Sequence, residues 1–417
     1  MPADQPRWMS QFALAAFWIA SSHLLVDACA NAIPAVQGQL EVRCGLTPLE
    51  SAWFAAIGAL ASGLCQPLFA WLSDRLNTRL FAGLGMACLS LCFCNLGYAR
   101  SPMTLFAIYG VGMLGVAMYH PIAAASMGQL LPGRRAALVS LFFVSGMAGS
   151  ALGALGGPYL ADSDDGFAWL SRMTVPGIVV AWILHLAIAK LPHRAAESEP
   201  GRARPELLDN KRWLVVVLLY FSSVMKFAVN LALFYLYLRW LTQDATGLHP
   251  DWNDQQVSDY VAPTLGQLIA VTQFGMGLGG IGSGLLLRPG REKWALVGLP
   301  CCFAPMIVSI PLVPFSWAYP LSLLAGIGFA GSIPVSITVA QRLMPDHPSM
   351  ASGLMLGGAW SLAMVAPPVT QVLLDFGGIQ VAFLATSFLL LASGLLLTLA
   401  PGRIFQLGLG LADRPHG

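Results

Sequence analysis

Three residues that could exchange protons or bind a polar ligand lie inside the first long apolar stretch, residues 12–36. His23, Asp27 and Asn31 follow one another at intervals of four, so on a helix they form one polar stripe. At about 1.5 Å per residue, His23 is expected roughly 20 Å deep, near a bilayer midplane, with Asp27 one turn further. An ionised carboxylate there costs at least ~2.5–3.5 kcal/mol, so it requires a partner or a wet cavity. The stripe predicts either a polar pair that packs helices or a protonatable site in a transport pathway.

Two further polar sites occur at similar depth in other apolar stretches. Lys226 and Asn230 repeat the four-residue interval in the seventh stretch, and a lysine at that depth cannot fully reach either surface. His120 precedes Pro121 in the fourth stretch, where a histidine can titrate near neutral pH and a proline frees a backbone carbonyl. Two readings of Asp27 and Lys226 remain open. One is a structural ion pair, and the other is a pair that protonation or an anion breaks to release a gate.

The elements that must hold these residues are membrane-spanning helices. The chain of 417 residues is 56% hydrophobic and only 10% charged, whereas soluble domains carry about 25% charged residues. A polytopic all-α membrane protein follows, and its net charge of +2 points to no nucleic-acid partner. Twelve apolar runs of spanning length are expected, near residues 11–38, 48–72, 80–99, 103–131, 136–160, 168–191, 213–241, 260–287, 294–313, 317–343, 350–374 and 379–400.

Charge distribution predicts the topology. With a cytoplasmic N-terminus, 17 of the 22 Lys and Arg residues fall on the cytoplasmic side, so the positive-inside rule places both termini there. The predicted units are a six-helix half at 1–192, a cytoplasmic linker at 193–211, a second six-helix half at 212–402 and a cytoplasmic tail at 403–417. The eight cysteines have no metal-ligand spacing with histidines, so we expect packing residues and neither a metal nor a cofactor.

The two halves repeat in sequence. At an offset of 213 residues, Gly115 matches Gly328, Pro121 matches Pro334 and Pro132 matches Pro345. Two six-helix halves related by an axis along the membrane normal are the arrangement of the major facilitator fold, in which the first and seventh helices are equivalent.

The loop after the second apolar stretch also carries a recognisable pattern. This loop has the sequence Ala70-Trp71-Leu72-Ser73-Asp74-Arg75-Leu76-Asn77-Thr78-Arg79. It resembles the major-facilitator loop signature G-x-x-x-D-R-x-x-R-R, with alanine in place of the first glycine of the signature. The corresponding segment Gly284–Arg291 keeps the glycine but lacks the aspartate. We expect Asp74, Arg75, Arg79 and Arg134 to serve a cytoplasmic gate, although a solvated loop would show similar charges.

Three stretches together resemble the fosmidomycin-resistance branch of the major facilitator superfamily. They are His23-x-x-x-Asp27 with Ile33-Pro34, then Tyr119-His120-Pro121, and finally Gly133-Arg134-Arg135 leading into Ser140-Leu141-Phe142 and Gly146-x-x-Gly149-Ser150-Ala151-Leu152-Gly153. That family has a glutamate after His-Pro where this chain has Ile122, so coupling stoichiometry and substrate can differ. The resemblance implies proton-driven export of small polar drugs, phosphonate antibiotics among them.

These observations lead to a proton-coupled transporter working by alternating access. We expect His23 and Asp27 to form the proton site, and Lys226, Asn230, His120 and Asn31 to line the substrate cavity. Two directions of transport stay open. One is efflux of a small polar or anionic compound. The other is proton symport of an organic anion, which is suggested because an anion at Lys226 and a proton at Asp27 would bind cooperatively. A membrane-embedded enzyme or sensor is the third class, but the apolar stretches contain no nucleophile–base pair. A monomer in the inner (cytoplasmic) membrane, with small-molecule substrate, protons and lipid as its partners, is expected.

Overall fold

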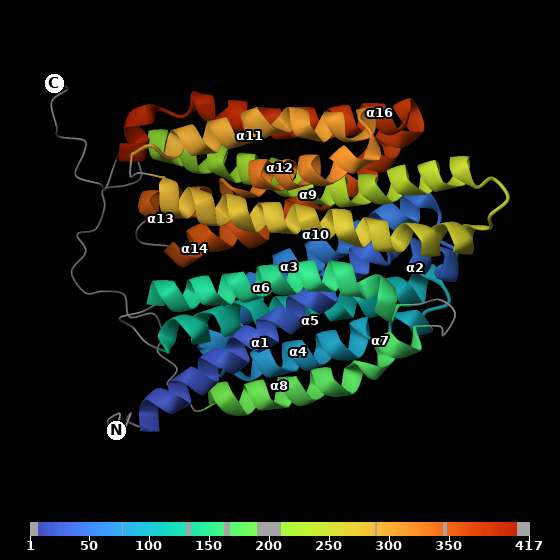
Figure 1. The fold of residues 1–417 in the computed structure, drawn as a ribbon. Helices are drawn as coiled ribbons and strands as arrows, with labels where there is room; N and C mark the ends of the chain where they lie inside the picture. Colours follow the sequence, from blue (N-terminus) through green and yellow to red (C-terminus); the bar gives the residue numbers. More distant parts are fainter. Residues whose placement is uncertain are drawn as a thin grey trace, which may run out of the picture. The chain divides into compact units, whose positions relative to one another are not determined.

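A computed structural model describes residues 7–76, 78–130, 135–161, 167–189, 210–287, 290–344 and 348–406, and within these ranges the chain is mostly helical and has no strand (Figure 1). The α-helices of the first part are α1 (Arg7–Ala35), α2 (Gln37–Cys44), α3 (Pro48–Arg75), α4 (Leu80–Phe93), α5 (Pro102–Gln129), α6 (Arg135–Leu160), α7 (Ala168–Arg172) and α8 (Thr174–Ala189). Those of the second part are α9 (Asn210–Leu248), α10 (Asp254–Leu286), α11 (Glu292–Ser309), α12 (Ala318–Ala330), α13 (Ile333–Leu343), α14 (Pro348–Gly353), α15 (Ala359–Leu362) and α16 (Ala366–Leu395).

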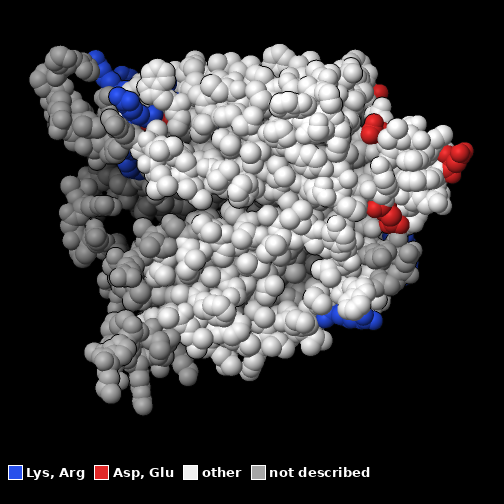
Figure 2. Space-filling view, viewed as in Figure 1, with Lys and Arg blue, Asp and Glu red and all other residues white. Residues whose placement is uncertain are grey.

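Eleven stretches among the described residues are long and apolar enough to span a membrane. The last of them, Met350–Leu399, is 50 residues long and is interrupted at Gly378, where φ is 73° and ψ is −173°. Charged side chains lie at the helix ends on the face in Figure 2, and the band between them is uncharged. This distribution is that of a protein whose helices cross a bilayer, because charge inside the hydrocarbon region is costly.

Contacts divide the chain into two compact units that do not follow the sequence halves. The first unit comprises residues 1–47, 64–200 and 251–267, and the second comprises 48–63, 201–250 and 268–417. The start of α3 belongs to the second unit because it packs there: Tyr235 donates a hydrogen bond to the carbonyl of Pro48 at 2.8 Å. The start of α10 belongs to the first unit, where Gln39 donates to Asp259 at 2.8 Å.

Within the first unit, α1 packs most extensively along α6, with α4, α5 and α8 beside it (Figure 1). Glycines make the close approach of α1 and α6 possible: an added Cβ at Gly149 would meet the carbonyl of Leu24, and one at Gly153 would meet that of Ala28. A backbone cannot move aside as a side chain can, so these positions fix the separation of the two helices. The separation in turn sets how far the polar stripe of α1 lies from α6.

The sequence repeat reappears as a contact. Arg79 donates to Gln129 at 2.5 Å in the first unit, and Arg342 donates to Glu292 at 2.7 Å in the second. Both members of the second pair lie 213 residues after those of the first, so the same connection between helix ends is built with the arginine at the other position and a glutamate facing it. The two parts of the chain therefore share one packing scheme at this end.

Candidate functional site

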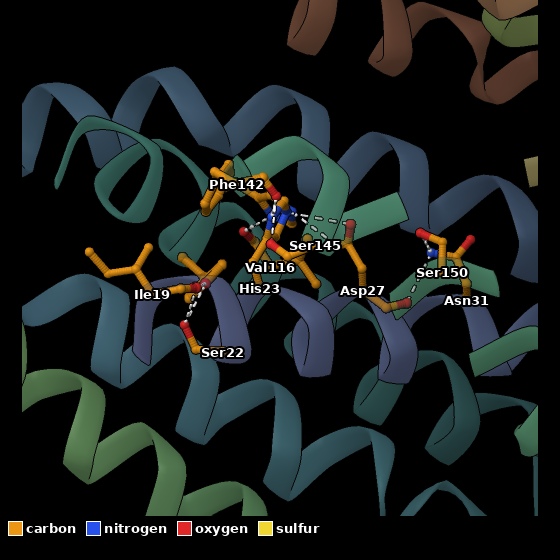
Figure 3. Close-up of polar contacts among 11 residues, drawn as sticks. Ile19, Ser22, His23, Asp27, Asn31, Val116, Phe142, Ser145 and Ser150 are labelled. Carbon is orange, nitrogen blue, oxygen red and sulfur yellow. Dashed lines mark hydrogen bonds and ion pairs between the residues drawn. The ribbon is translucent and has the colours of Figure 1, made fainter. Parts of the chain in front are cut away.

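The polar stripe of α1, labelled at His23, Asp27 and Asn31 in Figure 3, meets His120 of α5 to form a largely buried cluster of three titratable side chains. Asp27 places Oδ1 at 3.1 Å from Nε2 of His120 and Oδ2 at 3.4 Å from Nε2 of His23. The His23 side chain is nearly fully buried, while those of Asp27 and His120 remain 19% and 25% exposed. The structure therefore places His23 beside Asp27, and it brings His120, which we expected in the substrate cavity, to the same carboxylate.

Backbone carbonyls decide where the protons of the two histidines lie. Nδ1 of His23 is 2.7 Å from the carbonyl oxygen of Phe142, and Nδ1 of His120 is 3.0 Å from that of Val116. A carbonyl only accepts, so each Nδ1 carries the hydrogen. In a neutral imidazole the Nε2 facing Asp27 would then hold a lone pair, as does the carboxylate. The contact between His120 and Asp27 is a hydrogen bond only when a further proton lies between them.

The carboxylate divides its two oxygens between the two histidines. All three ligand atoms lie within 4.8 Å of one another, so their spacing and chemistry would also suit a metal ion. Each imidazole faces its own oxygen of Asp27, so a bound proton can lie in either contact.

Neighbouring side chains fix the cluster in place (Figure 3). The ring of His23 stacks on Phe142 with centroids 3.6 Å apart, and Tyr119 lies beside Ser22 with their hydroxyl oxygens at 2.7 Å. Asn31 donates to the backbone carbonyl of Asp27 and to the hydroxyl of Ser150, both at 3.0 Å. Asn31 thus ties α1 to α6 beside the cluster, and its amide nitrogen bonds the backbone of Asp27.

One glycine of α6 leaves the room that the cluster occupies. An added Cβ at Gly146 would lie 2.6 Å from Oδ2 of Asp27 and 2.8 Å from Nε2 of His23. Real Cβ atoms essentially never approach a heavy atom so closely. Gly146 therefore permits the close contact of the two side chains with α6.

Lys226 lies in the second unit and is fully buried on α9. Its ammonium nitrogen has no hydrogen-bond partner among the described residues. On the same face, Asn230 donates to the sulfur of Met276 at 3.4 Å, and Ser223 one turn earlier points to Met355. A protonated amine carries three donors, and burial without acceptors is unfavourable. This position can therefore receive a ligand that brings acceptors.

The predicted gate residues have different surroundings. Arg75 is exposed, with its guanidinium 5.1 Å from the ring centroid of Trp71. Arg79 is buried and donates to Ser126 as well as to Gln129, and burial lowers the pKa of its guanidinium. The side chain of Asp74 and the whole of Arg134 lie outside the described residues.

Several residues of the site were not predicted as site residues. Phe142 and Gly146 stand in the stretch that carries the family resemblance, and Tyr119 precedes His120, so their neighbourhood in sequence was a usable signal. The Glu292–Arg342 pair follows from the 213-residue offset applied to Arg79 and Gln129. The carbonyls of Phe142 and Val116 have no sequence signal, because any residue supplies one.

Comparison with known proteins agrees with this architecture. The family model described as Major Facilitator Superfamily matches residues 8–365. Over 400 residues, 92% of each chain, the protein is 26% identical to the fosmidomycin resistance protein of Escherichia coli (strain K12). Over 375 residues, 88% of each chain, it is 22% identical to an uncharacterized MFS-type transporter of Bacillus subtilis (strain 168). The fold is similar to that of a bacterial homolog of the human lysosomal transporter Spinster in its inward-facing and unoccupied conformation. The TM-score is 0.67 at 17% sequence identity, and the superposition covers 97% of this chain and 98% of that chain.

Proposed function

Since the chain belongs to the Major Facilitator Superfamily, as its motifs led us to expect, we propose that this multi-pass membrane transporter is a proton-coupled exporter of small polar or anionic compounds. The single observation that carries the coupling is Asp27 held between two histidines. An acid inside a membrane span is costly unless it is paired or functional, and here each of its oxygens faces a group that can bring a proton.

His120 belongs to the proton site in this proposal, with His23 and Asp27. The hydrogen bond of His120 to Asp27 supports this assignment, because that contact requires a bound proton, and loss of the proton leaves two lone pairs facing each other. Proton release would therefore loosen the link between α1 and α5. A two-state contact of this kind is what alternating access needs, since a bound proton must favour one arrangement of the helices.

The twelve-helix topology is part of the proposal. The 50-residue stretch Met350–Leu399 is more than twice as long as the roughly 20 residues that cross a bilayer as a helix, and its break at Gly378 divides it into two spans. With this division the described spans number twelve, and the excess of basic residues places both termini in the cytoplasm. The halves 1–192 and 212–402 are kept as the proposed evolutionary units, although compact packing follows other bounds.

Lys226 and Asn230 would bind the substrate. The buried ammonium, which has no hydrogen-bond partner within the described part of the chain, supports an anionic or strongly accepting group, as in a phosphonate. The fosmidomycin resistance protein of E. coli supplies the first probe by its name. Asn31, with an amide tied to α6, would support the proton site from one turn away.

Arg79 would act as the gate residue at the cytoplasmic helix ends, with Arg75, Asp74 and Arg134 in the same loops. The bonds of Arg79 to Ser126 and Gln129 support this role, because they join the start of α4 to the end of α5. A cytoplasmic gate opens only if such contacts can part.

The second candidate is proton symport of an organic anion, and Lys226 is the observation that favours it. An anion drawn in with a proton would neutralise Lys226 and Asp27 together. Antiport instead requires that substrate and proton exclude each other. The two candidates predict opposite directions of proton flow for the same substrate gradient.

The test uses purified full-length protein in proteoliposomes with an entrapped pH dye and fosmidomycin as the probe. A fosmidomycin gradient should drive protons in the opposite direction, and Asp27→Asn should abolish this flux. Flux in the same direction would replace export by symport. Equal flux in the native protein and Asp27→Asn would refute the proton site.

A further inference from the structure

The side chains of His23, Asp27 and His120 are also the donor set of a transition-metal site. Two imidazole nitrogens and one carboxylate bring their ligand atoms within 4.8 Å of one another. Imidazole suits Zn²⁺, Cu²⁺, Ni²⁺ and Fe²⁺, whereas Mg²⁺ and Ca²⁺ prefer oxygen ligands. The spacing of residues along the chain does not reveal this set, because His120 belongs to α5 and the other two ligands belong to α1.

Both imidazoles present the nitrogen that a metal ion requires. Each Nδ1 donates to a backbone carbonyl, at 2.7 Å in His23 and at 3.0 Å in His120. A metal-ligating histidine usually donates its other ring N–H to a carbonyl or carboxylate in the same way, and this contact fixes the orientation of the ring. The two Nε2 atoms therefore direct lone pairs toward the carboxylate of Asp27, and a cation must lie between such groups to hold them together.

The distances within the cluster suit ligands of a single ion. Bonds of about 2.0–2.1 Å to a tetrahedral Zn²⁺ place two ligand atoms roughly 3.3 Å apart. Oδ1 of Asp27 is 3.1 Å from Nε2 of His120, and Oδ2 is 3.4 Å from Nε2 of His23. The second distance is long for an N–H···O hydrogen bond, which is usually about 2.7–3.2 Å, but it is ordinary for neighbouring metal ligands. A carboxylate that binds through both oxygens keeps each oxygen beside its own imidazole.

An ion can reach these atoms and keep an open coordination position. The side chains of Asp27 and His120 are 19% and 25% exposed. Gly146 of α6 leaves space beside them, since an added Cβ would lie 2.6 Å from Oδ2 of Asp27. Three protein ligands leave the fourth position of a tetrahedral Zn²⁺ to water or another small ligand.

We propose that His23, Asp27 and His120 bind one Zn²⁺ or a similar divalent transition-metal ion. The bound ion joins α1 to α5, because two of its ligands belong to the first helix and one to the second. The ion uses the lone pairs that the coupling proton would use, so it excludes that proton from the cluster. This exclusion rests on the proposed function, whereas the binding of the ion does not.

The experiment measures Zn²⁺ binding to the purified full-length protein, freed of its affinity tag, by equilibrium dialysis and thermal unfolding. The variants His23→Gln, His120→Gln and Asp27→Asn each remove one ligand, and thermal unfolding without metal shows that each is folded. His185→Gln is the matched control, because His185 lies on α8 against Gly83 and is not one of the three ligands. Co²⁺ is the second probe and needs no variant, since its absorption spectrum distinguishes imidazole and carboxylate ligands from thiolates.

Native protein and His185→Gln should each bind one Zn²⁺ that Mg²⁺ does not displace, and the bound ion should raise the midpoint of thermal unfolding. Each ligand variant should lose more than about 100-fold in affinity, because loss of an outer-shell partner alone costs about 10–100-fold. The proposal is overturned if native protein binds no Zn²⁺, or if the three ligand variants bind it as tightly as native protein does. Sulfur-to-cobalt charge transfer would also overturn it, because the ion would then be bound by cysteines.

Failure of the metal site and failure of the proton site are distinguishable. If native protein binds no Zn²⁺ while Asp27→Asn loses the fosmidomycin-driven proton flux, only the metal site is overturned. If the three ligand variants lose Zn²⁺ while Asp27→Asn keeps the native flux, the metal site stands and the proton site is refuted.

Discussion

Gly146→Ala tests whether the close fit of α6 against the cluster matters for coupling. The new Cβ would lie 2.4 Å from Cε1 of His23 and 2.6 Å from Oδ2 of Asp27, where ordinary contact begins at 3.4 Å, so the two side chains must move by roughly 0.8–1 Å. A misplacement of about 1 Å can lower a rate on the order of 100-fold. Overpacking a close-packed site costs roughly 1–3 kcal/mol, which leaves a well-folded membrane protein intact.

The assay is fosmidomycin-driven proton flux in proteoliposomes, alongside thermal unfolding of the same preparations. Gly156→Ala is the matched control on the same helix, since an added Cβ there meets nothing within 4 Å. Gly146→Ala should lose about two orders of magnitude of flux while remaining folded, and Gly156→Ala should transport normally. Undiminished flux in Gly146→Ala would refute the argument that the separation of α1 and α6 sets the geometry of the proton site.

Three further predictions concern other parts of the chain. Lys226→Met removes a buried ammonium that has no hydrogen-bond partner among the described residues. The midpoint of thermal unfolding should therefore stay unchanged or rise, while uptake of labelled fosmidomycin into proteoliposomes should fall. A lower midpoint would show that Lys226 has a structural role. Arg79→Ala should destabilise the protein by about 2 kcal/mol through lost buried bonds, whereas the exposed Arg75→Ala should change stability by less than about 0.5 kcal/mol, both measured by thermal unfolding. Gly378→Ala should cost about 1–3 kcal/mol, because φ of 73° with ψ of −173° is a backbone conformation essentially confined to glycine, and an unchanged midpoint would contradict that backbone geometry.

The amino-acid sequence predicted much of this fold because membrane spans leave a strong signal. Long apolar runs, their charged ends and the 213-residue repeat all follow from the cost of burying charge in lipid. The number of spans is harder to predict than their existence: the described chain has eleven qualifying stretches against twelve predicted, because no polar loop separates the last two. Only the backbone conformation at Gly378 marks the division.

The composition of the site was less predictable than the fold. His23 and Asp27 are one helical turn apart, so their meeting follows from local geometry. His120 was placed among the substrate residues, since depth alone does not reveal which neighbour a side chain faces. Its contact with Asp27 depends on the crossing of α1 and α5, which the sequence does not encode in any local pattern.

The location of these contacts bears on how coupling can work. Both histidines that face Asp27 belong to the first unit, as do the carbonyls that fix their tautomers. The groups that bind and release a proton at Asp27 are therefore all in the first unit. An ion pair with Lys226 is not needed to stabilise the carboxylate of Asp27. The symport alternative depends on Asp27 losing a partner when an anion binds Lys226, whereas the proposed antiport needs only that proton and substrate favour different states of the transporter.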